Sequence, residues 1–251
     1  MNTHEETEEC SSNTQVLHEI QLIDKPIGFS SFQIVRIFKK HYKKVGHAGT
    51  LDPIAGGLLI ILIGEATHRF NEIQNYEKHY TGEMILGMVT DTYDISGRII
   101  EKMSTAQMCS IQENIVHLSI DELNKIANSF VGSIEQIPPR FSAIKQDGKK
   151  LYELSRKGQE VQPKKRKVLV KSFRIISIDY PIVRFDTGVG KGVYIRSLVH
   201  DFGKRLGCGA TLLSLYRTRI GNYRVTDARK IGDIVSNPFS KPSNVSPTYT
   251  K

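Results

Sequence analysis

A single carboxylate, Asp52, lies in a turn rich in glycine, threonine and proline, directly ahead of a strongly apolar run. The stretch reads GHAGTLDPIAGGLLIILIGEATH, residues 46–68. Its segment from Leu58 to Ile63 is short, partly β-branched and bounded by glycines, which predicts a fully buried strand. An aspartate beside such a strand either caps a turn, the commoner reason for aspartate there, or is positioned for chemistry. Its position alone leaves both interpretations open.

Two other short motifs suggest chemistry and fail when their spacing is checked. The turn GVGKG (188–192) is no phosphate loop of the type GxxxxGK[ST], because Phe185 stands where the first glycine is needed. A tight turn from strand to helix explains it better, although the free N–H groups of that helix start still favour anions. The triplet DTG (186–188) occurs once, whereas aspartic proteases need two carboxylates that share a proton.

The charge balance indicates the kind of partner. The chain has 251 residues, enough for one large domain or two small ones, and a formal net charge of +9. An excess of this size favours a polyanion, nucleic acid first and an anionic membrane surface second. A basic surface kept for solubility is the alternative that charge alone leaves open.

Metal binding and secretion find little support in the sequence. The three cysteines, at positions 10, 109 and 208, match no metal-ligand spacing, and such a sparse, odd count is typical of a reducing cytoplasm. The eight histidines form neither HxxxH nor HExxH, so no metal is expected. No apolar run approaches the length of a membrane span. We therefore expect a cytoplasmic protein without membrane contact.

The alternation of elements predicts the fold class. Helices are expected at 30–44, at 119–132 and after the glycine turn at 188–192, while 79–89 and 168–180 have the composition of strands. In the second helix Ser119 and Glu122 form a capping box and Gly132 is the expected stop. Strands that alternate irregularly with helices, several of them as hairpins, predict an α+β domain with a mixed, mainly antiparallel sheet and flanking helices.

The ends of the chain differ in composition from the middle. Residues 1–18 and 236–251 are rich in Ser, Thr, Asn, Pro or Glu, which predicts two disordered tails. Residues 19–235 then form the folded domain.

Basic side chains recur along the chain with aromatic residues among them. The runs KKHYKK (39–44) and KKRK (164–167) are each, taken singly, typical of a solvated face. Together with further cations they predict an electrostatic track for RNA, along which interleaved aromatics can stack on unpaired bases. These cations are Arg140, Lys145, Lys149, Lys150, Arg156 and Lys157, and the aromatics are Tyr42, Phe141 and Tyr152.

Four separated stretches together resemble one family. They are IDKPIGFSSFQIV (23–35), the stretch at 46–68, EQIPPRFSAIKQDGKKLYELSRKG (135–158) and GKGVYIRSLVHDFGKRLG (190–207), with further similarity at 79–97 and 215–223. Their order and content resemble the TruB family of bacterial tRNA pseudouridine synthases over nearly everything from about residue 20 to 230. The GTLDP-centred motif is highly specific.

The resemblance implies a function and a role for Asp52. Family members isomerise uridine to pseudouridine in the T loop of tRNA, at uridine 55, on a pseudouridine synthase fold. The target base is flipped out of the RNA, and no cofactor or metal takes part. The aspartate of GTLDP is the catalytic carboxylate, and Asp52 occupies its position. A non-catalytic tRNA-binding or chaperone protein is the alternative, against which the intact motif residues argue.

Other roles carry over by motif position. The resemblance assigns Tyr80 to stacking on the uracil and Arg196 to pairing with Asp52, and it lines the pocket with Tyr194 and Leu215. It places His47 in the space that the flipped base leaves in the RNA, and it gives Lys25 and Pro26 a supporting role. Segment 136–158 resembles the RNA-binding loop that closes over the T arm, so Lys145, Lys149 and Arg156 are expected RNA contacts.

The chain also departs from the family pattern. Phe141, Thr211 and Tyr216 replace the commoner Tyr, His and Arg, changes expected to affect RNA contacts more than catalysis. Few residues follow Gly221, so no C-terminal PUA domain is expected. A stand-alone monomer that binds the T stem-loop is the resulting expectation.

Overall fold

The computed structural model describes residues 19–104, 119–141, 145–146, 149–150 and 163–236. Of residues 145–146, 149–150 and 235–236 it describes the backbone alone. The expected N-terminal tail, the expected C-terminal tail apart from Ser236, and most of the expected RNA-binding loop therefore lie outside the described residues, as do Cys10, Cys109 and Arg156.

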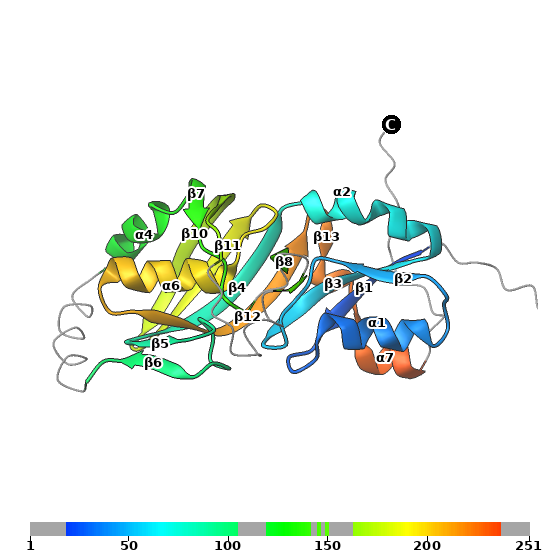
Figure 1. Ribbon diagram of the computed structural model, residues 1–251, viewed down its shortest axis with the longest axis horizontal. Helices are drawn as coiled ribbons and strands as arrows, with labels where there is room; N and C mark the ends of the chain where they lie inside the picture. The colour runs from blue at the N-terminus through cyan, green and yellow to red at the C-terminus, as the bar shows by residue number, and fades with distance from the viewer. Residues whose placement is uncertain (1–18, 105–118, 142–144, 147–148, 151–162, 237–251) are drawn as a thin grey trace, which may run out of the picture.

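A ten-stranded sheet runs through the whole molecule, which is elongated along it (Figure 1). The main order is β14-β1-β3-β12-β4-β11-β10-β7, with β2 added to β3 and β13 added to β12. The sheet strands are β1 (Glu19–Lys25), β2 (Val45–Ala48), β3 (Ala55–Ile63), β4 (Lys78–Leu86), β7 (Gly132–Gln136), β10 (Arg166–Asp179), β11 (Ile182–Val189), β12 (Ala210–Ile220), β13 (Tyr223–Arg224) and β14 (Arg229–Lys230). Two small hairpins pair β5 (Met88–Thr90) with β6 (Ile99–Lys102) and β8 (Lys145–Gln146) with β9 (Lys149–Lys150).

The strand directions confirm the expected α+β fold. Only β1 with β14 and β3 with β12 pair in parallel within the described sheet, and its other pairs are antiparallel. The helices are α1 (Ser31–Lys39), α2 (Phe70–Asn75), α4 (Ile120–Asn128), α6 (Ile195–Leu206) and α7 (Ile231–Ser236), with 3-10 turns η1 (Gly64–Arg69) and η2 (Val225–Asp227). In the part of the chain that is described, no helix combines the length and the apolar character needed to cross a membrane.

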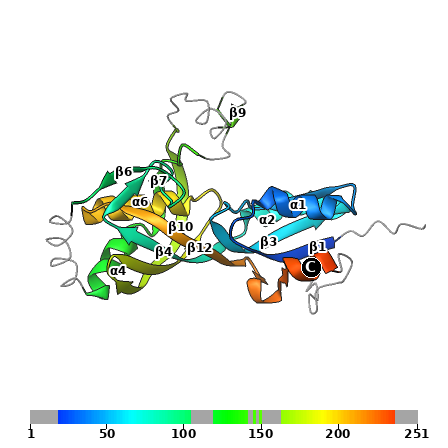
Figure 2. The same cartoon turned by 90° about the horizontal axis from the view of Figure 1, so that it is seen from below.

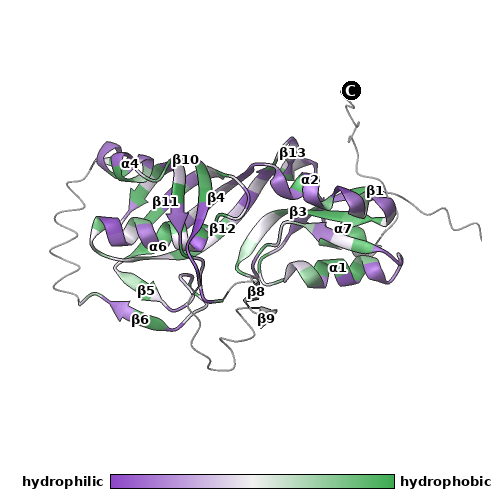
Figure 3. Ribbon diagram, turned by 45° about the horizontal axis from the view of Figure 1, so that its top comes forward, coloured by the Kyte–Doolittle hydropathy of each residue, from purple (hydrophilic) through white to green (hydrophobic). Residues whose placement is uncertain are grey.

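One half of the sheet is covered on both faces. Strand β3 is buried along its whole length, as its apolar run predicts, because helices α1 and α7 pack on one of its faces and α2 with η1 on the other. Figure 3 shows the apolar colour following this strand, whereas β10 and β11 alternate between polar and apolar.

Among the described residues, helices cover one face of the other half of the sheet. Helices α4 and α6 pack over the apolar side of β4, β10, β11 and β12, where Phe173 makes edge-to-face contacts with Phe185 and Phe202. Figures 1 and 2 show the two halves side by side, with β4 and β12 passing from one to the other. Residues 49–54 form the turn between β2 and β3, beside the parallel pairing of β3 with β12.

Three element boundaries differ from the sequence expectations. Helix α1 begins as expected, with Ser30 as its N-cap and Gln33 completing a capping box. It ends at Lys39, well before the expected residue 44. Helix α4 has the expected Ser119–Glu122 capping box but ends at Asn128, and Gly132 instead starts strand β7 with φ +110°. The strand expected at 79–89 is broken at Gly87, whose φ of +81° starts a separate hairpin.

The parallel junction between β3 and β12 depends on a glycine. Gly57 pairs with Arg217, has φ +94°, and a Cβ there would lie 2.3 Å from the Arg217 carbonyl oxygen. Both the backbone conformation and the close approach require the absence of a side chain. Gly57 therefore fixes where Arg217 sits along the sheet.

We expect Gly57→Ala to lower the free energy of unfolding by about 2–4 kcal/mol, because it adds backbone strain and a backbone clash at a buried junction. The measurement is urea unfolding of the purified protein. Gly232→Ala is the matched control, since its Cβ would meet open space within helix α7, and it should change stability by less than about 1 kcal/mol. Equal effects of the two substitutions would contradict this view of the junction.

Candidate active site

The turn that carries Asp52 is fixed at every second residue. The Gly49 carbonyl accepts a hydrogen bond from Arg217 Nη2 (2.9 Å), and the Pro53 carbonyl accepts one from the Gly28 amide (2.8 Å). Between them the buried Ser31 hydroxyl bonds both the amide and the carbonyl of Leu51, at 2.8 and 3.0 Å. These bonds fix the backbone of the turn at residues 49, 51 and 53; the Leu51 side chain is buried, whereas Thr50 is exposed and Asp52 is half-buried.

Asp52 faces a buried arginine. Its Oδ2 lies 2.9 Å from Nη2 of Arg196, and the two side chains are 44% and 6% exposed. The turn itself is closed by the backbone, where the Ala55 amide donates to the Asp52 carbonyl (3.0 Å). The carboxylate is therefore directed to a specific cationic partner, while more than a third of its surface stays open to a reactant.

A second carboxylate holds the other side of the same guanidinium. Asp94 Oδ2 lies 3.4 Å from Arg196 Nη1, and the Asp94 side chain is only 4% exposed. Arg196 Nη1 also donates to the Thr92 carbonyl (3.1 Å). The remaining Asp94 oxygen accepts from the Thr92 hydroxyl and the Ser96 amide, at 2.8 and 2.9 Å. The order along this chain of contacts is Asp52, Arg196, Asp94, with the exposed carboxylate at its outer end.

The turn that bears Asp94 is held against helix α6 at two successive helical turns. Arg196 and His200 are four residues apart and so lie on one face of the helix. The His200 ring stacks on Tyr93 with centroids 4.0 Å apart and planes 11° apart. Tyr93 has φ +62°, a conformation that favours glycine. The stack supports that backbone at the residue next to Asp94, and burial together with Lys204 lowers the pKa of His200.

The start of α6 also fixes the described end of the expected RNA-binding loop. The Gln136 side chain bonds both the amide and the carbonyl of Tyr194, at 2.8 and 3.1 Å. Ser197 donates to the Ile137 carbonyl (2.7 Å), and Arg196 Nη2 donates to the Phe141 carbonyl (3.1 Å). Segment 136–141 is thereby fixed beside the Asp52 carboxylate.

An apolar wall lies on the inner side of Asp52. Tyr80 and Leu215, each 8% exposed, belong to the same buried cluster as Leu51, the residue that precedes Asp52. The Tyr80 hydroxyl accepts a 3.4 Å hydrogen bond from Nη1 of Arg217, and the guanidinium lies 5.9 Å from the Tyr80 ring centroid. A flat base that lay against Asp52 would meet an aromatic ring and a leucine here.

Three buried cations, Arg217, Lys25 and Lys78, lie behind the turn. The Arg217 side chain is fully buried and also donates to the Leu58 carbonyl (2.7 Å). Lys25 donates to the carbonyls of Pro26 and Phe29, which agrees with the supporting role expected for it, and Lys78 donates to those of Gln74 and Tyr76. Burial, and next the charge of Arg217, lower the pKa of both lysines from 10.5 to about 8. This cluster makes the interior behind the site electropositive.

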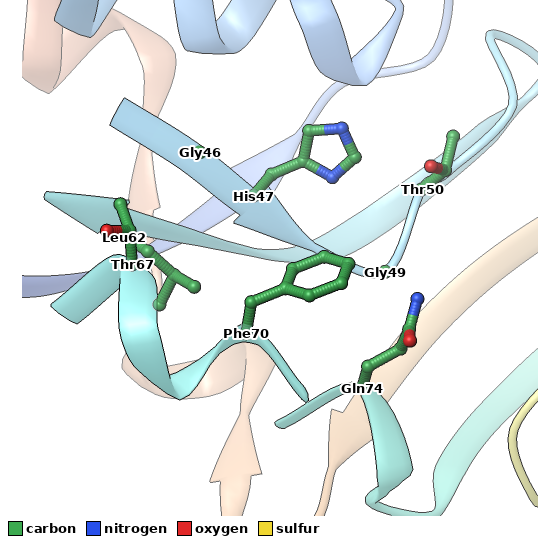
Figure 4. Close-up of a pocket in the computed structure, with 8 residues that line it drawn as sticks. All are labelled: Gly46, His47, Gly49, Thr50, Leu62, Thr67, Phe70 and Gln74. Atoms are coloured by element: carbon green, nitrogen blue, oxygen red, sulfur yellow. The ribbon is translucent and has the colours of Figure 1, made fainter. Parts of the chain in front are cut away.

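His47 lies on the far side of the same turn, on β2. It lines a cavity of about 400 Å³ together with Gly46, Gly49, Thr50, Leu62, Thr67, Phe70 and Gln74 (Figure 4). Burial, and next the charge of Arg217, lower the pKa of His47, so its ring is neutral at pH 7. Among the described side chains, buried His47 Nδ1 is one of the atoms for which no hydrogen-bond partner is found.

The structure thus brings together Asp52, Arg196, Tyr80 and Leu215, with Tyr194 and His47 on either side. Of the expected RNA contacts, the backbone of Lys145 and Lys149 forms the small β8–β9 hairpin, and Arg156 lies outside the described residues. Thr211 was expected to alter an RNA contact, and this is wrong for its side chain, which is fully buried and donates to the Met88 carbonyl. The described residues contain no cluster of three or more His, Cys, Asp or Glu suited to a metal.

Comparisons with known proteins decide the family. The family model described as TruB family pseudouridylate synthase (N terminal domain) matches residues 36–195. A protein from Clostridium tetani is 41% identical over 212 residues, 84% of this chain and 70% of that protein. One from Chloroherpeton thalassium is 41% identical over 224 residues, 86% of this chain and 89% of that protein. Both are named tRNA pseudouridine synthase B. The chain belongs to the TruB family.

Solved structures agree with this assignment. The pseudouridine synthase fold is shared with a chain in a Cbf5-Nop10-Gar1 complex, at TM-score 0.61 and 26% identity. The similarity covers 88% of this TruB-family chain and 54% of the solved one, so the chain spans about half the length of that relative.

Two buried residues that contact the site, Asp94 and Arg217, were not predicted from the sequence. Asp94 lies within the stretch 79–97, and its position between two hydroxyl residues in a turn, Thr92 and Ser96, was the available signal. Arg217 lies two residues after Leu215 on a strand, so both share one face of the sheet. An arginine on the face of a pocket-wall leucine is the signal that would have identified it.

The lowered pKa of Lys78 makes a testable contribution to stability. Below pH 8 the lysine is charged in both states, and the folded state bears the full cost of burying the charge. Between pH 8 and 10.5 the unfolded chain binds more protons than the folded one, so stability rises with pH relative to a variant without this group. The free energy of unfolding of the wild type minus that of Lys78→Met should increase by about 1–3 kcal/mol from pH 7.5 to pH 10.

Urea unfolding at several pH values measures this difference. Lys125→Met, at an exposed position on helix α4, is the control and should show no such increase. If the difference in unfolding free energy between the wild type and Lys78→Met does not change with pH, the pKa of Lys78 is not lowered in the folded protein.

Proposed function

We propose that this protein isomerises uridine to pseudouridine in the T loop of tRNA, at uridine 55, with Asp52 as the catalytic carboxylate. The observation that carries the proposal is the exposed Asp52 held at 2.9 Å by the buried Arg196, on a turn fixed at every second residue. Family membership and relatives named tRNA pseudouridine synthase B, at about 41% identity, support the reaction and its tRNA substrate.

The reaction detaches the uracil from C1′ of the ribose, rotates it and rejoins it through C5, which loses its proton. An ionised carboxylate serves this reaction as a nucleophile at C1′ or as a base toward the sugar. Both routes need Asp52 aimed at the sugar, and the Arg196 guanidinium, 2.9 Å away, holds the carboxylate in place. Tyr80 and Leu215 form the wall against which the flipped uracil stacks, and the Tyr80 ring lies next to the base during its rotation.

Substrate binding uses the basic character of the chain. With a net charge of +9, phosphate contacts supply much of the affinity. Recognition rests on the shape of the T stem-loop and on its splayed bases, as is usual for folded RNA. Lys145, Lys149 and Arg156 belong to the segment that covers the RNA, and Tyr194 lines the uridine pocket. The protein acts as a monomer in the cytoplasm and needs no cofactor.

Asp52→Asn tests the central claim. It keeps size and turn-forming ability but removes the charge and the nucleophilic oxygen, so single-turnover pseudouridine formation should fall by at least about a thousandfold. The substrates are an isolated T-arm hairpin and whole tRNA, with chemical mapping of the modified position. Folding and RNA binding should survive, as a thermal melt and a binding titration would show.

Asp186→Asn is the matched control, because this aspartate lies on β11 away from the Arg196 contacts, and its activity should stay within about twofold. Near wild-type turnover by a folded, RNA-binding Asp52→Asn protein would return Asp52 to a turn-forming role. Modification at another position of the tRNA would overturn the assignment to uridine 55.

Asp94 is a positioning residue in this proposal, since it contacts Arg196 rather than the reacting atoms. Asp94→Asn should lower kcat by about 10- to 100-fold and leave KM within about threefold, because the guanidinium loses one of its two carboxylates and Asp52 is less well aimed.

Asp91→Asn is the control in the same turn, where the carboxylate pairs with the exposed Arg98. Both variants are compared by steady-state kinetics on the T-arm hairpin. A rise in KM at unchanged kcat for Asp94→Asn would show that the network serves RNA binding instead.

A further inference from the structure

Helix α6 holds the turn that bears Asp94 by two contacts of different kinds. One is the ion pair of Asp94 with Arg196, and the other is the stack of Tyr93 on His200, with ring centroids 4.0 Å apart and planes 11° apart. Tyr93 directly precedes Asp94, and His200 follows Arg196 by one helical turn. The ring stack therefore acts on the same short segment as the ion pair.

The Tyr93 backbone is tied to strand β12, and its side chain ties the turn to α6. The Tyr93 amide donates to the Thr90 carbonyl (3.2 Å), and the Tyr93 carbonyl accepts from the Leu212 amide (3.0 Å). With φ +62°, Tyr93 has a conformation that a residue other than glycine keeps only where its surroundings hold it. The His200 ring is the described part of α6 that meets the Tyr93 side chain, so the turn is held between the strand and the helix.

The surroundings of His200 favour a neutral ring. Its Nδ1 is buried, and no hydrogen-bond partner is found for this atom among the described residues. The charged groups on the elements that pack around the two rings are Arg196, Asp201 and Lys204 on α6, Asp94 in the turn, Glu101 on β6 and Arg140. Burial, and next the charge of Lys204, lower the pKa of His200, and the charge of Glu101 opposes this shift. The stacked ring is therefore neutral at pH 7.

We propose that His200 is a positioning residue of the reaction, whose ring, stacked on Tyr93, keeps Asp94 against Arg196. This inference rests on the proposed function, because it takes Asp52 beside Arg196 as the reacting centre. None of the described contacts joins His200 to Asp52, so His200 acts through the Asp94 turn.

Acid weakens this arrangement, because a released His200 ring binds a proton more readily than the stacked ring. The released ring takes up its proton at the ordinary pKa of 6.5, whereas the stacked ring takes it up only at a lower pH. Below pH 6.5 the equilibrium constant for stacking therefore falls by up to about tenfold per pH unit, until the stacked ring is protonated as well. Well above pH 6.5 both forms are neutral, and the stack is independent of pH.

Single-turnover kinetics on the T-arm hairpin, with saturating enzyme, compare the wild type with two His200 variants from pH 5.5 to pH 8. His200→Phe keeps a flat ring against Tyr93 but binds no proton, so at pH 7.5 its rate constant should lie within about twofold of the wild type. At pH 5.5 the wild type should be at least about threefold slower than His200→Phe, since all other titrations affect both proteins alike. His200→Ala should be about tenfold slower than the wild type at pH 7.5, with Kd for the hairpin within about threefold.

Two further comparisons separate positioning from a general loss of stability. Because His200 acts through Asp94, His200→Ala added to Asp94→Asn should slow the reaction by less than about twofold beyond Asp94→Asn alone. His68→Phe is the matched control, since His68 lies on η1 with 69% of its side chain exposed, and its rate constant should equal that of the wild type at pH 7.5 and at pH 5.5. Thermal melts confirm that each variant is folded at both pH values. Multiplying effects of His200→Ala and Asp94→Asn, or profiles of the wild type and His200→Phe that coincide down to pH 5.5, would overturn the inference.

Nuclear magnetic resonance of the protein without RNA tests the stack independently of turnover. Cross-peaks between the His200 and Tyr93 rings should be present at pH 7.5 and weaken as the imidazole takes up its proton. Cross-peaks that persist unchanged through the titration would overturn the inference even if the wild type is fully active. Absence of pseudouridine formation by the wild type at every pH, with cross-peaks that weaken in acid, would instead overturn the proposed reaction and leave the pH-dependent stack standing.

Discussion

The buried guanidinium of Arg196 is the constraint on which the arrangement of the site depends. A side chain only 6% exposed must have its charge and its donors satisfied, since a buried unpaired charge costs several kcal/mol. The acceptors come from three segments far apart in the sequence: Asp52, then Thr92 with Asp94, then the Phe141 carbonyl. The packing of α6 onto the sheet therefore holds together the Asp52 turn, the Asp94 turn and segment 136–141. A planar group with five donors suits this task, and a lysine would not.

Arg217 performs the complementary task on the opposite side of the same turn. Its described partners are the carbonyls of Leu58 and Gly49 and the Tyr80 hydroxyl, so its positive charge is solvated by dipoles. Lys25 and Lys78 are bonded to backbone carbonyls in the same way, and burial, followed by the charge of Arg217, lowers the pKa of both lysines. Such an interior raises the local potential where a polyanion approaches. The three buried cations therefore place part of the net charge of +9 directly behind the site.

Much of this could be predicted from the sequence, for identifiable reasons. The apolar run at Leu58–Ile63 predicts a buried strand correctly, because β3 has helices on both faces and alternation is not needed. The GTLDP-centred motif places Asp52 correctly in a turn, and the motif around Arg196 identifies its partner, because such short motifs carry their own geometry. The end of α4 was misplaced at Gly132, because Ser129 already closes the last turn through its amide while Gly132 serves the next strand. A glycine in the sequence predicts a position at which a helix can end. Here the pairing of β7 with β10 uses Gly132, and the helix ends earlier, at Asn128.

What local patterns do not reveal is contact between segments that meet only in three dimensions. Asp94 becomes significant because α6 presents Arg196 to it, and Arg217 because β12 pairs with β3 at Gly57. Most charged residues lie at the protein surface, so residue type alone predicts that Asp94 and Arg217 are exposed. Both are buried instead, and their burial is what identifies them as part of the site.

Bonds to the backbone of residues 49, 51 and 53 make the turn that carries Asp52 rigid. On this rigid turn the Thr50 side chain lines the His47 cavity, and the Asp52 side chain faces Arg196. In the proposed reaction the substrate supplies all the atoms of the product, so the protein contributes position and charge at C1′ and at the rotating base. A carboxylate on a mobile loop would lose most of that contribution, because small misplacements of a catalytic group cost large factors in rate. If Asp52 is the carboxylate of the proposed reaction, the bonds from Ser31, Gly28 and Arg217 to the turn are as necessary to that reaction as the carboxylate they support.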